Sequence, residues 1–347
     1  MLRTQLALQL LGACWRADGL RAGTPRHIRM GLMEDGMRFA AVPALAEWVE
    51  SQGGECACAT GACVPSQGIG LEAARDVRSG EAVVTVPDAL AITSATALRS
   101  SIGSWLSDFD PQLSDFALIA LALIHERRLG DQSAWGAWLG SGVWPTDIDD
   151  LPLTWAAESS AGGDGGEWWA PAQDRLAAVE ADYAWLQENV FDNEPMLFPS
   201  AVFSLEEYTK AHALAYSRCM WIEGSDDDDG ADERPALIPM IDLANHAEYP
   251  SVELKHFPAK TNLFGKEEAP ARFELRAFDD LPAGSPFTLS YLAPTSSDML
   301  LDYGFLESPV RAQASTACVC VAAAAVVENR AAPMSTRGGR FGSDRHA

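Results

Sequence analysis

The sequence predicts an α+β fold in which a β-rich core is interrupted by a block of helices. Short runs of β-branched and aromatic residues, bounded by Gly, Pro or Asp, occur before residue 90 and again after residue 270. The segments between them carry apolar residues at helical spacing. This order favours a β core with a helical insertion over alternating βαβ units. The predicted strands are 81–86 (EAVVTV), 272–278 (RFELRAF) and 286–291 (PFTLSY).

The helical block has its own local signals. A helix is predicted over 113–129, because its apolar pattern stops at Gly130, and another over 171–190. A third begins at Ser204 and opens the segment SLEEYTKAHALAYSRCMWI. Its serine is followed three residues later by Glu207, and this pair forms a capping box in which each side chain answers an unpaired backbone N–H.

The chain is expected to divide into three parts. The first 33 residues hold five arginines and one acid, opposite to the balance of the remainder, and we interpret 1–40 as a targeting segment. A transit peptide fits this pattern better than a secretory signal, and a frayed or mispredicted N-terminus is the alternative. Residues 41–308 form the folded domain, with the helical insertion at about 100–200. Residues 309–347 are rich in Ala, Arg, Gly and Ser and form a low-complexity tail.

Charge and cysteine content exclude several classes of ligand. With 25 Lys+Arg against 49 Asp+Glu the net charge is −24, so phosphate backbones are repelled and no nucleic-acid partner is expected. The apolar stretch 6–14 is too short to span a bilayer, so no membrane association is expected either. Cys56, Cys58 and Cys63 are spaced to share zinc only if a fourth ligand exists; none is evident, so we predict a loop and no metal site.

The first candidate for chemistry is the G-x-G of Gly68, Ile69 and Gly70. Two glycines one residue apart let the backbone approach a ligand closely, or they simply make a tight turn. No helix with a third glycine follows, so the dinucleotide-binding fingerprint is excluded.

The second candidate is an apolar run, 237–241, that ends abruptly in the polar residues Asp242, Asn245 and His246. Each polar side chain needs a partner if it is enclosed. Asp242 and His246 at i, i+4 can bind a metal on a helix, but no third ligand accompanies them, and a lone interior histidine is more often structural. Asn245 offers a donor and an acceptor for an amide, an adenine edge or the local backbone.

The third candidate is aromatic. Tyr291, Tyr303 and Phe305 lie within 15 residues of one another. They can wall a narrow apolar channel with phenolic oxygens at its mouth, or they can belong to an ordinary core.

Taken in this order, the motifs resemble those of the SET-domain protein methyltransferases, in the branch that includes the plant Rubisco large-subunit lysine methyltransferase. That branch shows G-x-G-L-x-A followed by R-D-I-x-x-G-E, then P-x-x-D-x-x-N-H, then a tyrosine ahead of L-L-x-x-Y-G-F. The corresponding segments here are 68–81, 239–246 and 291–305, and the resemblance covers about 45–307. Segments 125–135 and 216–218 fit it as well.

The resemblance implies a knotted β-rich SET core with S-adenosyl-L-methionine (AdoMet) on one face and a lysine channel opening from the other. Tyr291 is the implied catalytic residue. The residues implied to hold or brace the cofactor are Gly68, Ile69, Gly70, Asp242, Asn245, His246 and Phe305. Those implied to shape the lysine channel are Ser217, Arg218 and Tyr303.

The implied activity is AdoMet-dependent methylation of a lysine on a protein substrate. Methylation of a protein histidine, a non-catalytic SET-fold binding module and a poorly folding gene product are the alternatives. The expected partner is a protein that presents a lysine to a monomeric enzyme, in the chloroplast or otherwise in the cytoplasm or nucleus. The branch carries a helical C-terminal domain that grips its substrate, and only the tail follows Ser308, so Rubisco is not the expected target.

Overall fold

The computed structural model describes residues 26–57, 59–64, 68–107, 113–144, 151, 153–154, 169–222, 233–261, 267–291 and 296–305. The chain divides into two units, Met1–Phe305 and Leu306–Ala347, and every described residue belongs to the first. The predicted tail lies outside the described residues. So does most of the predicted targeting segment, and its proposed boundary at residue 40 falls inside a helix, so this division stays a prediction.

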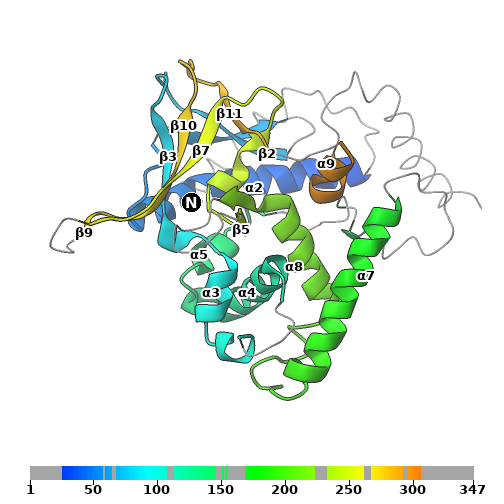
Figure 1. Cartoon of the computed structure of the whole chain (residues 1–347). Helices are drawn as coiled ribbons and strands as arrows, with labels where there is room; N and C mark the ends of the chain where they lie inside the picture. The colour runs from blue at the N-terminus through cyan, green and yellow to red at the C-terminus, as the bar shows by residue number, and fades with distance from the viewer. Residues whose placement is uncertain are drawn as a thin grey trace, which may run out of the picture. The chain divides into compact units, whose positions relative to one another are not determined.

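The described unit mixes helices and strands, which confirms the predicted α+β class. The α-helices are α2 (Arg26–Ser51), α3 (Ser94–Arg99), α4 (Asp115–Leu129), α5 (Gly136–Leu139), α7 (Trp169–Leu186), α8 (Leu205–Arg218) and α9 (Ser296–Tyr303). The strands are β1 (Ala59–Val64), β2 (Gly68–Ala73), β3 (Ala82–Pro87), β4 (Met220–Ile222), β5 (Arg234–Ala236), β6 (Asn245–His246), β7 (Val252–Phe257), β8 (Lys260–Thr261), β9 (Glu267–Ala269), β10 (Arg272–Ala277) and β11 (Pro286–Leu289). Figure 1 shows β2, β3, β7, β10 and β11 gathered at one end and α3, α4, α5, α7 and α8 at the other.

Two sheets form the β part of the unit. One has the order β1-β2-β11-β6, and the other has the order β3-β10-β7. In the first sheet β11 runs antiparallel to β2 and parallel to β6. The sheets therefore combine strands from the beginning and the end of the described chain, as expected of a core with an insertion. The predicted knot stays a prediction, since no described contact tests it.

The three predicted strands are confirmed with small shifts at their ends, as β3, β10 and β11. Strand β10 lies in the middle of its sheet, and Phe273 and Leu275 are completely buried there. Glu274 on the same strand is also buried, and Arg272 and Arg276 each lie 2.6 Å from one of its carboxylate oxygens. A buried carboxylate needs such partners, so the polar position does not interrupt the strand.

Helix α4 confirms the second predicted element. Ser114 accepts a hydrogen bond from the Ala117 N–H at 3.2 Å, and the helix ends at Gly130, whose φ of 53° suits glycine. Residues 117–126 are all buried, because α4 is surrounded by α3, α5 and α8. A helix that is apolar all round is a core helix, and here it anchors the insertion.

Helix α8 begins as predicted but ends earlier than its apolar pattern. The Ser204 hydroxyl accepts from the Glu207 N–H at 3.2 Å, whereas the Glu207 carboxylate faces Lys210 at 3.4 Å. The reciprocal half of the predicted capping box is therefore wrong, because the carboxylate has an ion pair on its own helix. The helix stops at Arg218, and Met220–Ile222 forms β4 instead, paired with β5.

Two other elements differ from the predictions. The helix predicted over 171–190 is α7, but its last part, Gln187–Phe191, is a π-helix. The G-x-G forms no tight turn: it belongs to β2 and pairs with β1 on one side. Within the described ranges, none of the helices combines the length and the apolar character that a membrane crossing requires.

Candidate active site

Three motifs that lie far apart in the sequence meet in one sheet. The G-x-G lies on β2, the Asn-His pair forms β6, and β11 runs between them toward Tyr291. In this arrangement Phe287 of β11 pairs with Leu71 of β2, and Thr288 of β11 pairs with Asn245 of β6. The sheet therefore places the predicted cofactor segments on the two strands that flank the strand leading to the predicted catalytic tyrosine.

Tyr291 is fixed by two hydrogen bonds to the Asn-His segment. Its hydroxyl donates to the carbonyl of Ala244 at 2.9 Å, and its backbone N–H donates to Nδ1 of His246 at 3.1 Å. Because the phenol O–H is the donor, the phenolic oxygen keeps its lone pairs to accept another hydrogen. The position of Tyr291 thus depends on the chain between residues 244 and 246.

An aromatic cluster surrounds this tyrosine. The ring centroids of Tyr291 and Tyr303 are 4.4 Å apart, and that of His246 is 5.2 Å from Tyr291. Phe305 lies 6.2 Å from His246 and 6.4 Å from Tyr291. These spacings are those of interacting aromatic rings. Four predicted site residues therefore form one cluster, and the two tyrosines in it face a cavity.

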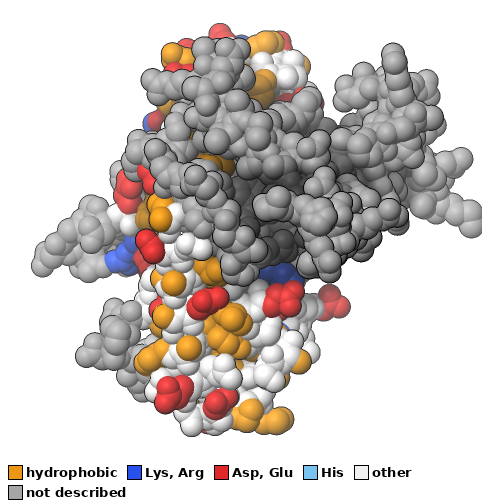
Figure 2. Space-filling view, turned by 90° about the vertical axis from the view of Figure 1, so that its right-hand side faces the viewer, with side chains coloured by type: hydrophobic (Ala, Val, Ile, Leu, Met, Phe, Trp, Pro, Cys, Tyr) orange, Lys and Arg blue, Asp and Glu red, His pale blue; other side chains and the backbone are white. Residues whose placement is uncertain are grey.

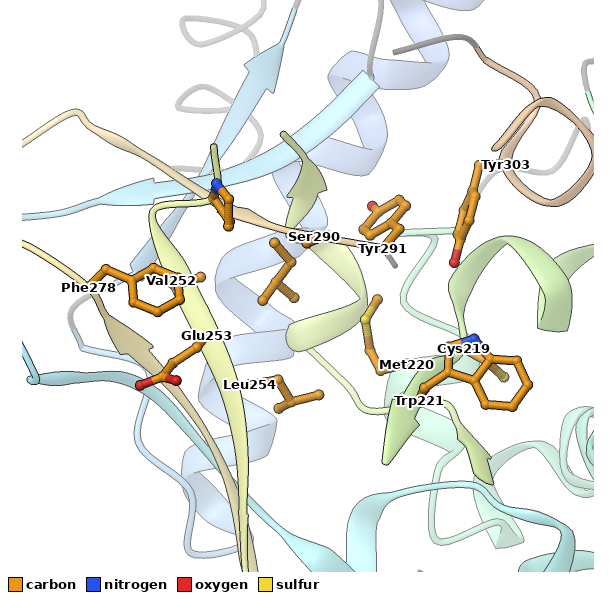
Figure 3. A pocket seen from close by; sticks show the side chains of 12 residues that line it. Cys219, Met220, Trp221, Val252, Glu253, Leu254, Phe278, Ser290, Tyr291 and Tyr303 are labelled. Atoms are coloured by element: carbon orange, nitrogen blue, oxygen red, sulfur yellow. The ribbon is translucent and has the colours of Figure 1, made fainter. Parts of the chain in front are cut away.

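That cavity has a volume of about 220 Å³. Figure 3 shows Tyr291 and Tyr303 side by side at one end, and Val252, Glu253 and Phe278 at the other. Phe278 and Trp221 are 44% and 42% exposed, which is unusual for large aromatic side chains. The side of the cavity that they form is therefore accessible to a ligand. The lining residues are Cys219, Met220, Trp221, Pro250, Val252, Glu253, Leu254, Phe278, Leu289, Ser290, Tyr291 and Tyr303. The lining is mostly apolar, as in a channel for a hydrocarbon stem.

A buried ion pair lies beside the tyrosine. Arg218 is 3.6 Å from Oδ2 of Asp242 and donates to the backbone oxygen of Asp242 at 3.3 Å. The same Oδ2 accepts a hydrogen bond of 2.7 Å from the indole N–H of Trp144. The Asp242 side chain is completely buried, and within the described structure its other oxygen, Oδ1, has no hydrogen-bond partner. Such a carboxylate is stable only because its partners are fixed.

Burial dominates the electrostatics of the site. It raises the pKa of Asp242 to about 6, although Arg218 and the Trp144 hydrogen bond favour the charged form. Burial also raises the pKa of Tyr291 to about 12. The charge of Arg218 lowers this pKa, and the charge of Asp242 raises it. The pKa of Tyr303 is raised for the same reason. Both phenols therefore stay neutral at physiological pH.

The predicted site residues fall into four sets, and of these residues only Tyr291 and Tyr303 are among the described residues that line the cavity. Tyr291, Tyr303, Phe305 and His246 form the aromatic cluster, while Arg218 and Asp242 form the ion pair beside it. Gly68, Ile69, Gly70 and Asn245 lie on β2 and β6 and do not line the cavity. Ser217 stays within its helix, where its hydroxyl donates to the Leu214 carbonyl at 3.2 Å, and it does not line the cavity either. The individual roles of these residues stay predictions.

The Cys-x-Cys-x4-Cys segment is described only in part. Cys56 is buried, and burial raises the pKa of its thiol to about 12. Cys58 and the side chain of Cys63 lie outside the described residues.

Sequence reasoning missed several residues of the site. Trp144 reaches Asp242 from 98 residues away in the chain, so no spacing rule could find it. Ala244 acts through its backbone carbonyl, which side-chain patterns do not report. Cys219 and Met220 line the cavity, but they look like the last turn of a helix in the sequence. The apolar pattern continues through both residues, so nothing local in the sequence separates them from the helix.

Comparison with solved structures identifies the architecture. The SET domain of LSMT bound to lysine and AdoHcy superposes with a TM-score of 0.63 at 24% identity, covering 77% of this chain and 57% of that one. Rubisco LSMT bound to AdoMet gives a TM-score of 0.60 at 24% identity, covering 78% and 57%. The chain has the SET fold. This confirms the fold predicted from the three ordered motifs.

Relatives found by sequence agree with the assignment of the fold. A chloroplastic fructose-bisphosphate aldolase-lysine N-methyltransferase from Arabidopsis thaliana is 27% identical over 266 residues, 76% of this chain and 51% of the relative. A chloroplastic ribulose-1,5 bisphosphate carboxylase/oxygenase large subunit N-methyltransferase from Nicotiana tabacum is 27% identical over 242 residues, 70% and 46%. SET domain-containing protein 4 from Mus musculus is 24% identical over 296 residues, 82% and 62%.

The predicted resemblance to this branch is thus confirmed. No protein-family model matches the chain. The chain spans about half the length of the first two relatives.

Proposed function

We propose that this SET chain is an AdoMet-dependent protein-lysine N-methyltransferase. The observation that carries the proposal is the cavity walled by Tyr291 and Tyr303, at the end of the strand that lies between the G-x-G strand and the Asn-His strand. A mostly apolar cavity with two neutral phenols at one end suits the long hydrocarbon stem of lysine, with its amine beside the phenols. The relatives named as lysine methyltransferases support the same acceptor.

The residues on β2 and β6 fit the cofactor. The buried amide nitrogen of Asn245, Nδ2, has no hydrogen-bond partner in the described part of the chain, although a buried donor normally has one. A purine edge or a carboxylate would satisfy it. Gly68 and Gly70 add no side chain on β2, which lies on the other side of β11, so the backbone there can lie close to a ligand. These residues would hold AdoMet, which supplies a methyl group already activated by its sulfonium.

The chain's own residues then have two tasks. The first is to favour the neutral amine, since a free lysine at pH 7 is neutral only about once in two thousand molecules. The apolar wall disfavours the ammonium form by desolvation, and the Arg218–Asp242 pair leaves little net charge beside it. The second task is to hold the amine where it would lie in line with the methyl of bound AdoMet, and the packed aromatic cluster would do this.

Tyr291 is not the base in this scheme. With its pKa raised to about 12, only about one phenol in 10⁴ is ionised at pH 8. Its hydroxyl already donates to Ala244, so its oxygen would be able to accept weak C–H hydrogen bonds from the methyl of bound AdoMet. The amine proton therefore leaves to water before transfer.

The substrate is proposed as a protein that presents a lysine, and the compartment as the chloroplast, which the two chloroplastic relatives favour. Figure 2 shows more acidic than basic side chains among the described residues of its face, which fits a basic substrate surface better than nucleic acid.

The test begins with the purified chain and AdoMet. Calorimetry should show one site, and incubation of the chain with methyl-labelled AdoMet and a lysate should label a protein band. Mass spectrometry of that band should find methylated lysine. If the band holds methylhistidine and no methyllysine, the acceptor is histidine rather than lysine. If the chain does not bind AdoMet, a non-catalytic SET-fold binding module is favoured instead.

A further inference from the structure

The segment that leads into Asp242 is strained. Met240, with φ 66° and ψ −44°, is the one non-glycine residue of positive φ in the ranges that the structure describes. It is completely buried, so solvent does not relieve the strain. The short 3₁₀ turn Ile241–Leu243 follows directly. A buried residue keeps such a conformation only where its surroundings impose it, and such residues cluster at functional sites.

The hydrogen bonds of Asp242 hold the chain in this conformation. Its carboxylate is held by the Trp144 indole N–H at 2.7 Å, and its backbone oxygen by Arg218 at 3.3 Å. The exposed fraction of these charged side chains is 14% for Arg218 and zero for Asp242, so no solvent competes for the carboxylate. The Trp144 bond is charge-assisted, and bonds of this kind are about twice as strong as neutral ones.

Trp144 is itself held in place. Its ring packs edge-on against Trp138 with centroids 5.0 Å apart, and the guanidinium of Arg127 lies 5.3 Å over it. Both contacts come from the helical insertion, on α5 and α4. Trp144 itself lies in the segment that follows α5, and these two contacts hold its ring while the indole N–H donates to Asp242.

The 3₁₀ turn that Asp242 holds leads directly to the residue that accepts the hydrogen bond of the Tyr291 hydroxyl. Ala244 follows the turn directly, and its carbonyl takes the Tyr291 O–H at 2.9 Å. Asn245, one residue further on, is secured separately because β6 pairs with β11. Loosening Asp242 should therefore disturb the Tyr291 hydroxyl more than the residues facing the cofactor.

We propose that Trp144 is a positioning residue for methyl transfer: through the carboxylate of Asp242 it fixes the strained turn, and through Ala244 it aims the hydroxyl of Tyr291. The inference rests on the proposed function. It links the helical insertion to the chemistry by a single hydrogen bond, and it assigns Trp144 a role in rate rather than in cofactor affinity.

The test compares two tryptophans that pack against each other. Trp144→Phe removes the indole N–H but keeps an aromatic ring. Trp138→Phe is the matched control, because it keeps an aromatic ring against Trp144, and Trp138 is 1% exposed with an N–H that has no hydrogen-bond partner among the described residues. Single-turnover methylation at saturating AdoMet, using the acceptor labelled in the lysate, gives the rate, and calorimetry gives the AdoMet Kd.

Trp144→Phe should lower the rate by roughly 10- to 100-fold, the loss expected of one charge-assisted hydrogen bond, while the Kd changes by less than about threefold. Trp138→Phe should stay within about threefold of the wild type on both. In an Asp242→Ala background, Trp144→Phe should have at most about a threefold further effect. If Asp242→Ala does not fold, Asp242→Asn serves, and there the effect of Trp144→Phe should shrink at least about threefold.

Three results would overturn the assignment: equal rates for Trp144→Phe and Trp138→Phe, a fall in AdoMet affinity that matches the fall in rate, or an undiminished effect in the Asp242 background. A wild-type chain that binds no AdoMet and labels no acceptor would be recognised separately. It would end the proposed function and the catalytic role of Trp144 with it.

Discussion

His212 should make the protein less stable as the pH falls from 7.5 to 5. This histidine of α8 is 2% exposed, and neither ring nitrogen has a hydrogen-bond partner within the described residues. Its nearest aromatic neighbour is Tyr208, 4.6 Å away between ring centroids. Burial alone lowers its pKa from 6.5 to about 4, since the imidazolium would lose its hydration.

The sign and size follow from proton linkage. Below pH 6.5 the unfolded chain binds a proton at this histidine, whereas the folded chain binds it only near pH 4. The contribution of His212 to the free energy of unfolding is therefore complete above pH 6.5 and declines as the pH falls from 6.5 to about 4. At pH 5 the difference amounts to about 2 kcal/mol, and it approaches about 3 kcal/mol near pH 4. Asp242, whose folded pKa is raised to about 6 from 3.8, acts oppositely and loses stability as the pH rises through this window. That contribution is the same in any His212 variant.

The assay is urea unfolding of the wild type and His212→Phe at pH 7.5 and pH 5. The stability of His212→Phe relative to the wild type should rise by about 2 kcal/mol at the lower pH. Tyr208→Phe is the control, because burial raises the pKa of the Tyr208 phenol and it does not titrate in this range. An identical pH dependence in the wild type and His212→Phe would refute the reasoning, because it would mean that the pKa of His212 does not change on folding.

Three further outcomes are expected. Tyr291→Phe should lower single-turnover methylation about 10²-fold and leave the AdoMet Kd nearly unchanged by calorimetry, and unaltered turnover would remove its catalytic role. Arg218→Met should destabilise the fold by about 3 kcal/mol in urea unfolding, because it leaves the buried Asp242 without its charged partner; a loss below about 1 kcal/mol would show the pair to be unimportant. Gly103→Ala should cost about 3 kcal/mol by the same measurement, since an added Cβ would overlap the Leu98 backbone oxygen, and wild-type stability would contradict this packing.

The elements that could be predicted are those with local causes. The cap at Ser204, the stop at Gly130 and the three strand runs depend on residues within a few positions, so sequence rules found them. The half of the capping box that failed shows the limit, because Glu207 had an equally local alternative in Lys210. The G-x-G shows another: its backbone freedom is local, but whether it turns or extends depends on β1 and β11.

The ordered motifs by themselves predicted the SET fold, which the solved structures confirm, and they predicted which segments form the site, because the order and residue types of those segments are properties of the chain. Only the tertiary structure decided which residues act together. It brought Trp144 to Asp242 across 98 residues, used the Ala244 carbonyl to hold Tyr291, and opened a cavity beside the two tyrosines. These are contacts between groups that are distant in sequence, and their strength comes from burial, which no single segment of the chain possesses on its own.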